Sequence, residues 1–138
     1  MASLPTEPGR DWLDILTRPT LAAFSAAFSI DPELSASVLY ASIHGVARIR
    51  AFFAATRAMY DPFAFTRESR AGDRSFLEWE GSYRGKAVEG VTILERDSGG
   101  GAISRIRLFH LPYHQVVAFA DDLSVNLGDH STAATPRA

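Results

Sequence analysis

The chain has 138 residues, the size of one domain, and contains no cysteine, which excludes disulfides, thiolate metal sites and a cysteine nucleophile. Its 14 basic and 16 acidic residues are mixed along the sequence and give a net charge of −2. No basic stripe indicates a nucleic-acid partner, and no run of like charge indicates a membrane surface or a charged tail.

The first part of the chain, up to Arg10, is polar and contains proline, and we expect it to be a loose segment. It lacks the basic start and the apolar run of a signal peptide. No later apolar stretch approaches the roughly 20 residues that span a bilayer. We therefore expect a cytoplasmic protein with no membrane partner.

Two helical segments are predicted next. Over Asp11–Arg18, Trp12, Ile15 and Leu16 fall on one face, and the charged ends of the segment complement the helix dipole. A second segment begins at Pro19 and carries apolar residues at near-helical spacing, namely Leu21, Phe24 and Phe28. Both segments are expected to cover one face of a sheet.

A turn is predicted at Asp31-Pro32, followed by a strand over Leu34–Ser42 in which alternate residues share a face. Tyr40 shares its face of this strand with Leu34 and Val38. The alternation therefore predicts that Tyr40 points into the interior.

The longest helix is predicted from Gly45 to Tyr60. One apolar stripe runs along it and contains Val46, Ile49, Phe53, Thr56 and Tyr60. Such a stripe must be buried against a large surface, and a sheet formed by the later strands is the one available. Asp61-Pro62 ends the helix, and a short strand over Phe63–Glu68 follows.

Three consecutive strands are predicted over Arg74–Tyr83, Ala87–Arg96 and Ala102–His110, joined by glycine-containing hairpin turns. The middle strand is apolar on both faces, as in a strand that is covered on both sides. The chain's own helices can cover only one face of this sheet. We therefore expect a homodimer that forms through the other face.

The end of the chain is predicted to be helical over Tyr113–Leu123, because its apolar residues recur at spacings of three and four. Residues 126–138 are small and polar, and we expect them to form a flexible tail.

This order of elements resembles the NTF2-like superfamily, and within it the SnoaL-like and ketosteroid-isomerase-like domains. The residues that carry the likeness are the strand–glycine–helix pattern of Leu34–Phe53, Tyr83-Arg84-Gly85-Lys86, Val88-Glu89-Gly90 and Asp97–Phe109. The likeness covers about residues 10–125, which we take as the domain. It implies an α+β cone in which a curved antiparallel sheet packs on helices around a pocket. Relatives commonly dimerise through the outer face of the sheet.

The isomerase branch of this superfamily is matched poorly at its functional positions. An ungapped match places Ala36 where that branch has its base, Thr92 near its hydrogen-bond-donating acid, and Trp12 near the phenol of its first helix. Because alanine cannot take a proton, ketosteroid isomerisation is disfavoured.

Four titratable residues near the sheet are candidates for catalysis. Glu78 and Glu80 share one face of a strand, and such a carboxylate pair can divide acid and base roles, although a solvated pair is the commoner case. Glu89 lies in a strand whose other residues are predicted to be buried. A carboxylate in such a strand is more commonly explained by an ion pair, here with Arg105 or Arg107, than by catalysis. His110 ends a strand and suits acid–base chemistry, with a half-exposed structural histidine as the alternative.

A metal site is not expected. His110 and His114 are four residues apart, a spacing that suits a metal on a helix, but Pro112 between them argues against that helix. We expect neither a metal nor a cofactor.

A ligand pocket is predicted where the first helix, the first strand, the long helix and the sheet converge, lined by Trp12, Tyr40, Phe53, Tyr60, Thr92 and His110. Two functions remain open. The first is binding of a small, apolar, ring-bearing molecule without turnover, which the alanine at position 36 favours. The second is a small acid–base enzyme of the isomerase, cyclase, dehydratase or hydrolase type acting on such a molecule.

Overall fold

The computed structural model describes residues 7–127, which form one curved six-stranded sheet with four helices. The strands are β1 (Phe28–Ala36), β2 (Ile43–His44), β3 (Phe63–Ala71), β4 (Arg74–Tyr83), β5 (Lys86–Arg96) and β6 (Ile103–Leu111). The helices are α1 (Arg10–Leu16), α2 (Leu21–Ser25), α3 (Val46–Arg57) and α4 (Tyr113–Leu127). Neighbouring strands follow the order β2-β1-β6-β5-β4-β3, and all pairs are antiparallel except β1 with β6.

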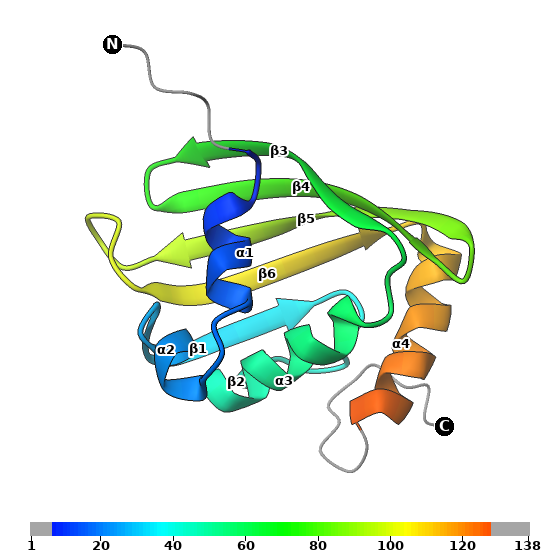
Figure 1. Ribbon diagram of the computed structural model, residues 1–138, viewed down its shortest axis with the longest axis horizontal. Helices are drawn as coiled ribbons and strands as arrows, with labels where there is room; N and C mark the ends of the chain where they lie inside the picture. Colours follow the sequence, from blue (N-terminus) through cyan, green and yellow to red (C-terminus); the bar gives the residue numbers. More distant parts are fainter. Residues whose placement is uncertain (1–6, 128–138) are drawn as a thin grey trace.

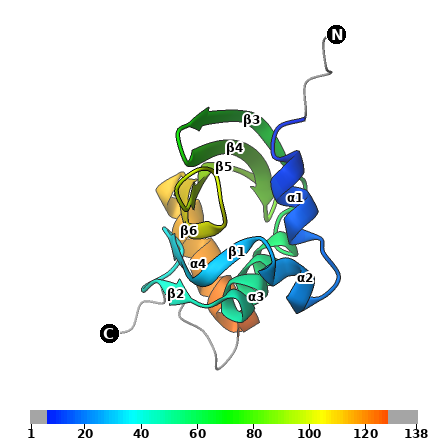
Figure 2. The same ribbon diagram turned by 90° about the vertical axis from the view of Figure 1, so that its left-hand side faces the viewer.

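The helices lie on the inner side of the curved sheet. Figure 1 shows α1 crossing the face of the sheet, with α2 and α3 along its lower edge and α4 at one end. The turned view shows the sheet curling around, with α1 and α3 on its inner side (Figure 2). The predicted α+β cone, with a curved sheet packed on helices, is confirmed, but the sheet is mixed and not purely antiparallel, because β1 pairs in parallel with β6.

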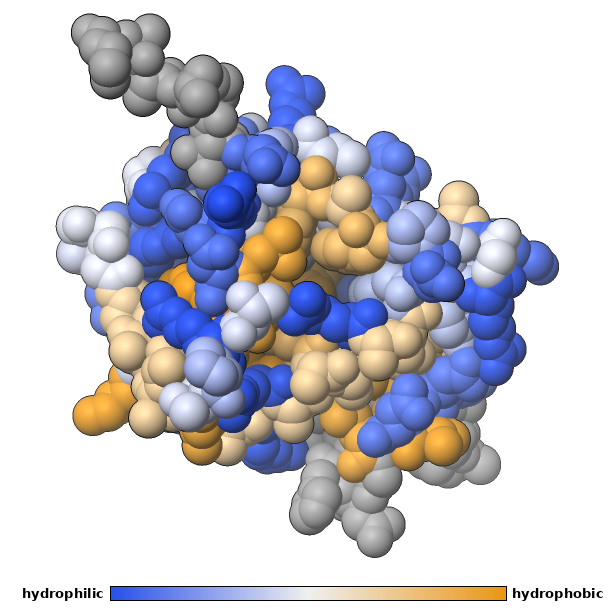
Figure 3. All heavy atoms as spheres, viewed as in Figure 1, coloured by the Kyte–Doolittle hydropathy of each residue, from blue (hydrophilic) through white to orange (hydrophobic). Residues whose placement is uncertain are grey.

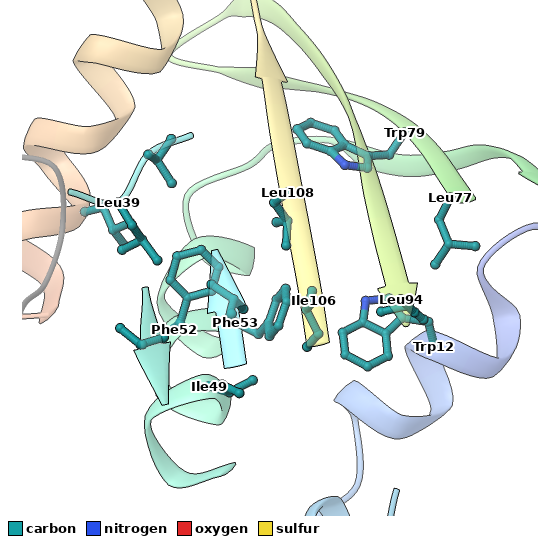
Figure 4. Close-up of a cluster of buried hydrophobic side chains, with 14 of the residues drawn as sticks. Trp12, Leu39, Ile49, Phe52, Phe53, Leu77, Trp79, Leu94, Ile106 and Leu108 are labelled. Carbon is teal, nitrogen blue, oxygen red and sulfur yellow. The ribbon is translucent and has the colours of Figure 1, made fainter. Parts of the chain in front are cut away.

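Helix α3 supplies a large part of the helical side of the core. It begins after Gly45, whose backbone φ of 92° is a conformation that glycine adopts without strain. Its buried residues follow the helical repeat, as the sequence predicted, and are Ile49, Phe52, Phe53 and Thr56. Figure 4 shows the rings of Phe52 and Phe53 facing the side chains of the sheet and Trp12 of α1. The helix ends at Arg57, three residues before the predicted end.

The strand predicted over Leu34–Ser42 is wrong in its bounds. Strand β1 starts earlier, at Phe28, and ends at Ala36, where the Leu39 amide donates to the Ala36 carbonyl and turns the chain. Pro32 lies within β1 and not in a turn, at a place where the pairing register with β6 shifts. A proline inside a sheet is tolerated at such an irregularity because the ladder hydrogen bond is already lost there.

The remaining strands were predicted closely, since all three central strands agree with the sequence to within a residue or so. Strand β3 is longer than predicted and reaches Ala71. Helix α4 extends to Leu127, so the first two residues of the predicted tail are helical, and residues 128–138 lie outside the described residues. Two hydrogen bonds from the Gln115 side chain to the carbonyls of Tyr83 and Lys86 tie α4 to the β4–β5 hairpin. Within residues 7–127, no helix is long and apolar enough to cross a membrane.

Candidate functional site

A small cavity lies between α1, the C-terminal end of α3 and the inner face of the sheet. Its volume is about 30 Å³, enough for roughly one or two water molecules. The lining residues are Trp12, Leu13, Leu16, Phe53, Thr56, Arg57, Tyr60, Phe63, Phe65, Trp79, Thr92 and Leu108. In the space-filling view of Figure 3, apolar residues surround a hollow near the middle of the face that α1 crosses. The lining is almost entirely apolar or aromatic, and it contains no carboxylate.

The floor of the cavity depends on a glycine. Trp79, Gly90 and His110 are directly paired neighbours on β4, β5 and β6, so all three face the same side of the sheet. A Cβ atom at Gly90 would lie 2.5 Å from Cζ2 of Trp79 and 2.2 Å from the carbonyl oxygen of Phe109. The missing side chain therefore lets the indole lie across β5 and reach His110, with the two ring centroids 5.1 Å apart.

Trp79 has a polar atom with no partner. Its side chain is 2% exposed, and its Nε1 is buried and makes no hydrogen bond to any described residue. In Figure 4 the nitrogen edge of the ring is turned toward the part of the core that holds Leu108 and Trp12, both of which line the cavity. Because buried polar groups in native proteins nearly always have partners, this donor calls for an explanation.

His110 links the cavity wall to the surface through hydrogen bonds at both ring nitrogens. Its Nε2 lies 3.0 Å from the Tyr60 hydroxyl, and its Nδ1 lies 2.9 Å from Oγ of Ser37. The backbone amide of His110 also donates to Ser37 Oγ, at 3.0 Å. Tyr60 lines the cavity, whereas Ser37 is an exposed residue in the turn after β1. The three side chains form a continuous polar chain through an otherwise apolar interior.

The members of this chain are neutral at physiological pH. Burial lowers the pKa of His110 from 6.5 to about 4, because the imidazolium would lose its hydration in the core. Burial also raises the pKa of the Tyr60 phenol, because the phenolate would be desolvated there. In either tautomer of neutral His110, one ring nitrogen donates and the other accepts.

The structure brings four of the six predicted lining residues to one cavity: Trp12, Phe53, Tyr60 and Thr92. His110 is buried on the same face of the sheet, behind Tyr60 and Trp79. The prediction for Tyr40 is wrong, because its side chain is 84% exposed. Since β1 ends at Ala36, strand alternation no longer determines where Tyr40 points.

The predicted carboxylates lie elsewhere. Glu78, Glu80 and Glu89 are exposed on the outer face of the sheet, with Glu80 directly opposite Glu89, so none can reach a molecule in the cavity. The ion pairs suggested for Glu89 are not formed. Arg105 lies 3.8 Å from Glu33, and Arg107 lies 3.6 Å from Glu95.

The sequence did not predict several residues of the site, among them Ser37, Arg57 and, as a hydrogen-bond donor, Trp79. Ser37 contacts His110 only because β1 pairs in parallel with β6, a long-range pairing that the local sequence does not reveal. Arg57 is exposed on α3, but it also reaches the edge of the cavity. Among residues 7–127, no three His, Asp or Glu side chains come together as a metal site.

Comparison with known proteins identifies the fold. No family model matches the chain, and no curated protein matches its sequence. A steroid delta-isomerase from Pseudomonas aeruginosa superposes with a TM-score of 0.75 at 16% identity, over 93% of this chain and 98% of that one. The chain has the NTF2-like fold. A conserved bacterial protein with a cystatin-like fold from Silicibacter pomeroyi gives a TM-score of 0.72 at 18% identity, over 83% of this chain and 80% of that one.

A SnoaL-like family protein from Agrobacterium tumefaciens is a more distant neighbour, with a TM-score of 0.54 at 13% identity over 75% of this chain and 94% of that one. At these identities the NTF2-like likeness describes the fold and not the chemistry. The cavity therefore has to be interpreted from its own residues.

We predict that burial of neutral His110 makes stability depend on pH. The pKa of this group is lower in the folded than in the unfolded chain, so the unfolded state binds the extra proton as pH falls. The contribution of His110 is complete above about pH 6.5 and is lost as pH falls toward 4. Urea titrations should show about 2 kcal/mol less stability at pH 5 than at pH 7.5 from this group.

The His110→Gln variant removes this titration and should flatten the pH profile, whatever its stability at neutral pH. His114→Gln changes an exposed histidine on α4 and should keep the wild-type profile. Equal pH dependence in the wild type and the His110→Gln variant would show that His110 is not buried in its neutral form.

Proposed function

We propose that this protein binds a small, apolar, ring-bearing molecule in the inner cavity, without turning it over. The observation that carries the proposal is the lining, in which aromatic and aliphatic side chains surround a few polar atoms and no carboxylate. Such walls bury rings well, and the polar atoms fix their orientation. One protein of the same fold is named as a steroid delta-isomerase, and a steroid is a molecule of this apolar kind.

Binding requires the cavity to enlarge, because its present volume of about 30 Å³ is far below the roughly 300 Å³ of a typical ligand pocket. Helix α1 is the wall best suited to move. It has seven residues, which are too few to form a stable helix without packing. A 2.9 Å hydrogen bond from the Gly9 amide to the Glu68 carboxylate holds the N-terminal end of this helix. A ligand that displaces Trp12 and Leu16 outward would contact the apolar side chains of the sheet beneath them.

Cavity filling tests the proposal. Thr92 points into the cavity from β5, and its neighbour Val91 points outward from the same strand. Thr92→Ile should fill the space and weaken toluene binding at least about tenfold by heteronuclear NMR titration, since a methylene or two of overlap costs roughly 1–3 kcal/mol. Val91→Ile places the same residue on the outer face and should bind toluene like the wild type. Toluene that binds neither the wild type nor the control would refute the proposed function.

A second candidate function, acid–base catalysis, is favoured by the polar chain from Tyr60 through His110 to Ser37. This chain could carry a proton between the cavity and the surface, since each member can both donate and accept. The test is exchange of the methyl protons of acetophenone for deuterium in D₂O. We expect no acceleration over buffer, because the cavity has no carboxylate base. Exchange that Tyr60→Phe abolishes would favour the enzyme instead.

We also propose a homodimer that forms through the outer face of the sheet. Alternation along β4, β5 and β6 places an apolar group on that face, which consists of Phe76, Val91, Ile93, Phe109 and Leu111. Phe109 is 44% exposed and Leu111 is 59% exposed. A contiguous apolar face of this kind is typical of an interface between protein chains.

Leu111→Asp should convert the dimer to a monomer in sedimentation experiments at micromolar concentration, because a second carboxylate would be buried at the interface directly opposite Glu89. Val125→Asp changes a residue of α4 that is 78% exposed and should leave the dimer intact. A wild-type protein that sediments as a monomer would contradict the proposal.

A further inference from the structure

The geometry points to a specific chemical group on the ligand: an oxygen that accepts a hydrogen bond from Nε1 of Trp79. This inference rests on the proposed function, because it adds a polar contact to apolar binding in the same cavity. It makes Trp79 the residue that determines specificity for the oxygen.

The first argument is that the donor is buried without a partner. Trp79 Nε1 has no hydrogen bond among the described residues, and the side chain is 2% exposed. Leaving a buried donor unpaired costs free energy that folding alone does not recover. A ligand oxygen placed against Nε1 would remove this cost. Binding of such a ligand would therefore supply the hydrogen-bond partner that Nε1 lacks.

The second argument is that the donor is held in place. Gly90 lets the indole lie across β5, and the ring is packed at its sides by three other rings. The centroid of the Trp79 ring lies 5.5 Å from that of Tyr60, 5.2 Å from that of Phe63 and 5.1 Å from that of His110. The indole therefore cannot rotate toward another acceptor. A donor that is already held in position binds an acceptor without losing further conformational entropy.

The third argument concerns whether the site recognises a hydrogen-bond donor or a hydrogen-bond acceptor on the ligand. An indole nitrogen can only donate, so it selects an acceptor and rejects an ammonium group, which has no lone pair. The Tyr60 hydroxyl beside it is already hydrogen-bonded to His110. Arg57 at the cavity edge is also a donor only, and in the described residues no carboxylate lies within ion-pair distance of it. The polar part of the ligand is therefore a hydrogen-bond acceptor, and carbonyl and carboxylate oxygens are the strongest acceptors that these donors could bind.

Acetophenone and α-methylstyrene test the inference because they have nearly the same shape and differ in C=O against C=CH₂. We expect acetophenone to bind about threefold to tenfold more tightly, the value of one net hydrogen bond. The chain has two tryptophans, so the Trp12→Phe variant identifies the Trp79 indole signal in the NMR spectrum. In the wild type, that signal should move downfield with acetophenone and not with α-methylstyrene.

The Trp79→Phe variant keeps an aromatic ring and removes the donor, so the preference for acetophenone should disappear. The shift of the wild-type indole signal is an independent readout that does not require this variant to fold. Benzoate separates the two sources of oxygen. Tighter binding of benzoate than of acetophenone would assign the oxygen to a carboxylate, and the reverse order would assign it to a neutral carbonyl. Either order supports the inference if the tighter binding is lost in Trp79→Phe, and overturns it if the tighter binding is lost in Arg57→Gln but kept in Trp79→Phe.

Equal binding of acetophenone and α-methylstyrene would overturn the inference and leave the proposed function standing. An indole signal that does not move with any probe would also overturn it, since the N–H would then either point at a neighbouring ring or hold a water that no ligand displaces. Failure of both probes to bind would overturn the inference together with the proposed function.

Discussion

The inner side of this fold is closed by the contact between Trp12 of α1 and Phe53 of α3, whose ring centroids lie 5.3 Å apart at nearly perpendicular planes. Helix α1 is too short to persist without packing, so its position over the sheet depends on this contact. Helix α3 is in turn placed by its buried stripe against the sheet. The same contact that completes the core therefore covers the cavity, and any ligand has to compete with it.

The charged side chains lie where they constrain the function of the candidate site. Glu78, Glu80 and Glu89 lie on the outer face of the sheet, whereas Tyr60 and His110, which form the polar part of the cavity wall, are neutral. In an apolar interior these neutral groups can orient an oxygen through hydrogen bonds, but they offer no strong base at neutral pH. A binding function agrees with this arrangement more directly than proton abstraction does.

The sequence was sufficient for the fold and for about half of the site, and the reason differs from element to element. Local periodicity determined the long helix and the three hairpin strands, and these place Phe53 and Thr92 correctly. It failed at Tyr40, because the end of β1 is set by its parallel pairing with β6 and not by its own alternation.

The chemistry of the site depended on the same long-range pairing. The sequence identified His110 but not its partners, since Ser37 and Tyr60 are far from it along the chain and meet it only in the folded protein. Glu78, Glu80 and Glu89 were reasonable candidates by residue type, but the alternation of side chains along their strands places them on the outer face of the sheet. An error of one residue in parity moves a side chain to the other face, which makes the site harder to predict than the fold.

The central claim is that the inner cavity opens to hold an apolar ring, and anomalous diffraction from crystals soaked in bromobenzene tests it most directly. The account predicts a bromine peak among Trp12, Phe53, Trp79 and Thr92, with α1 displaced outward. Bromine found only on the outer face of the sheet, with the cavity still closed, would contradict it.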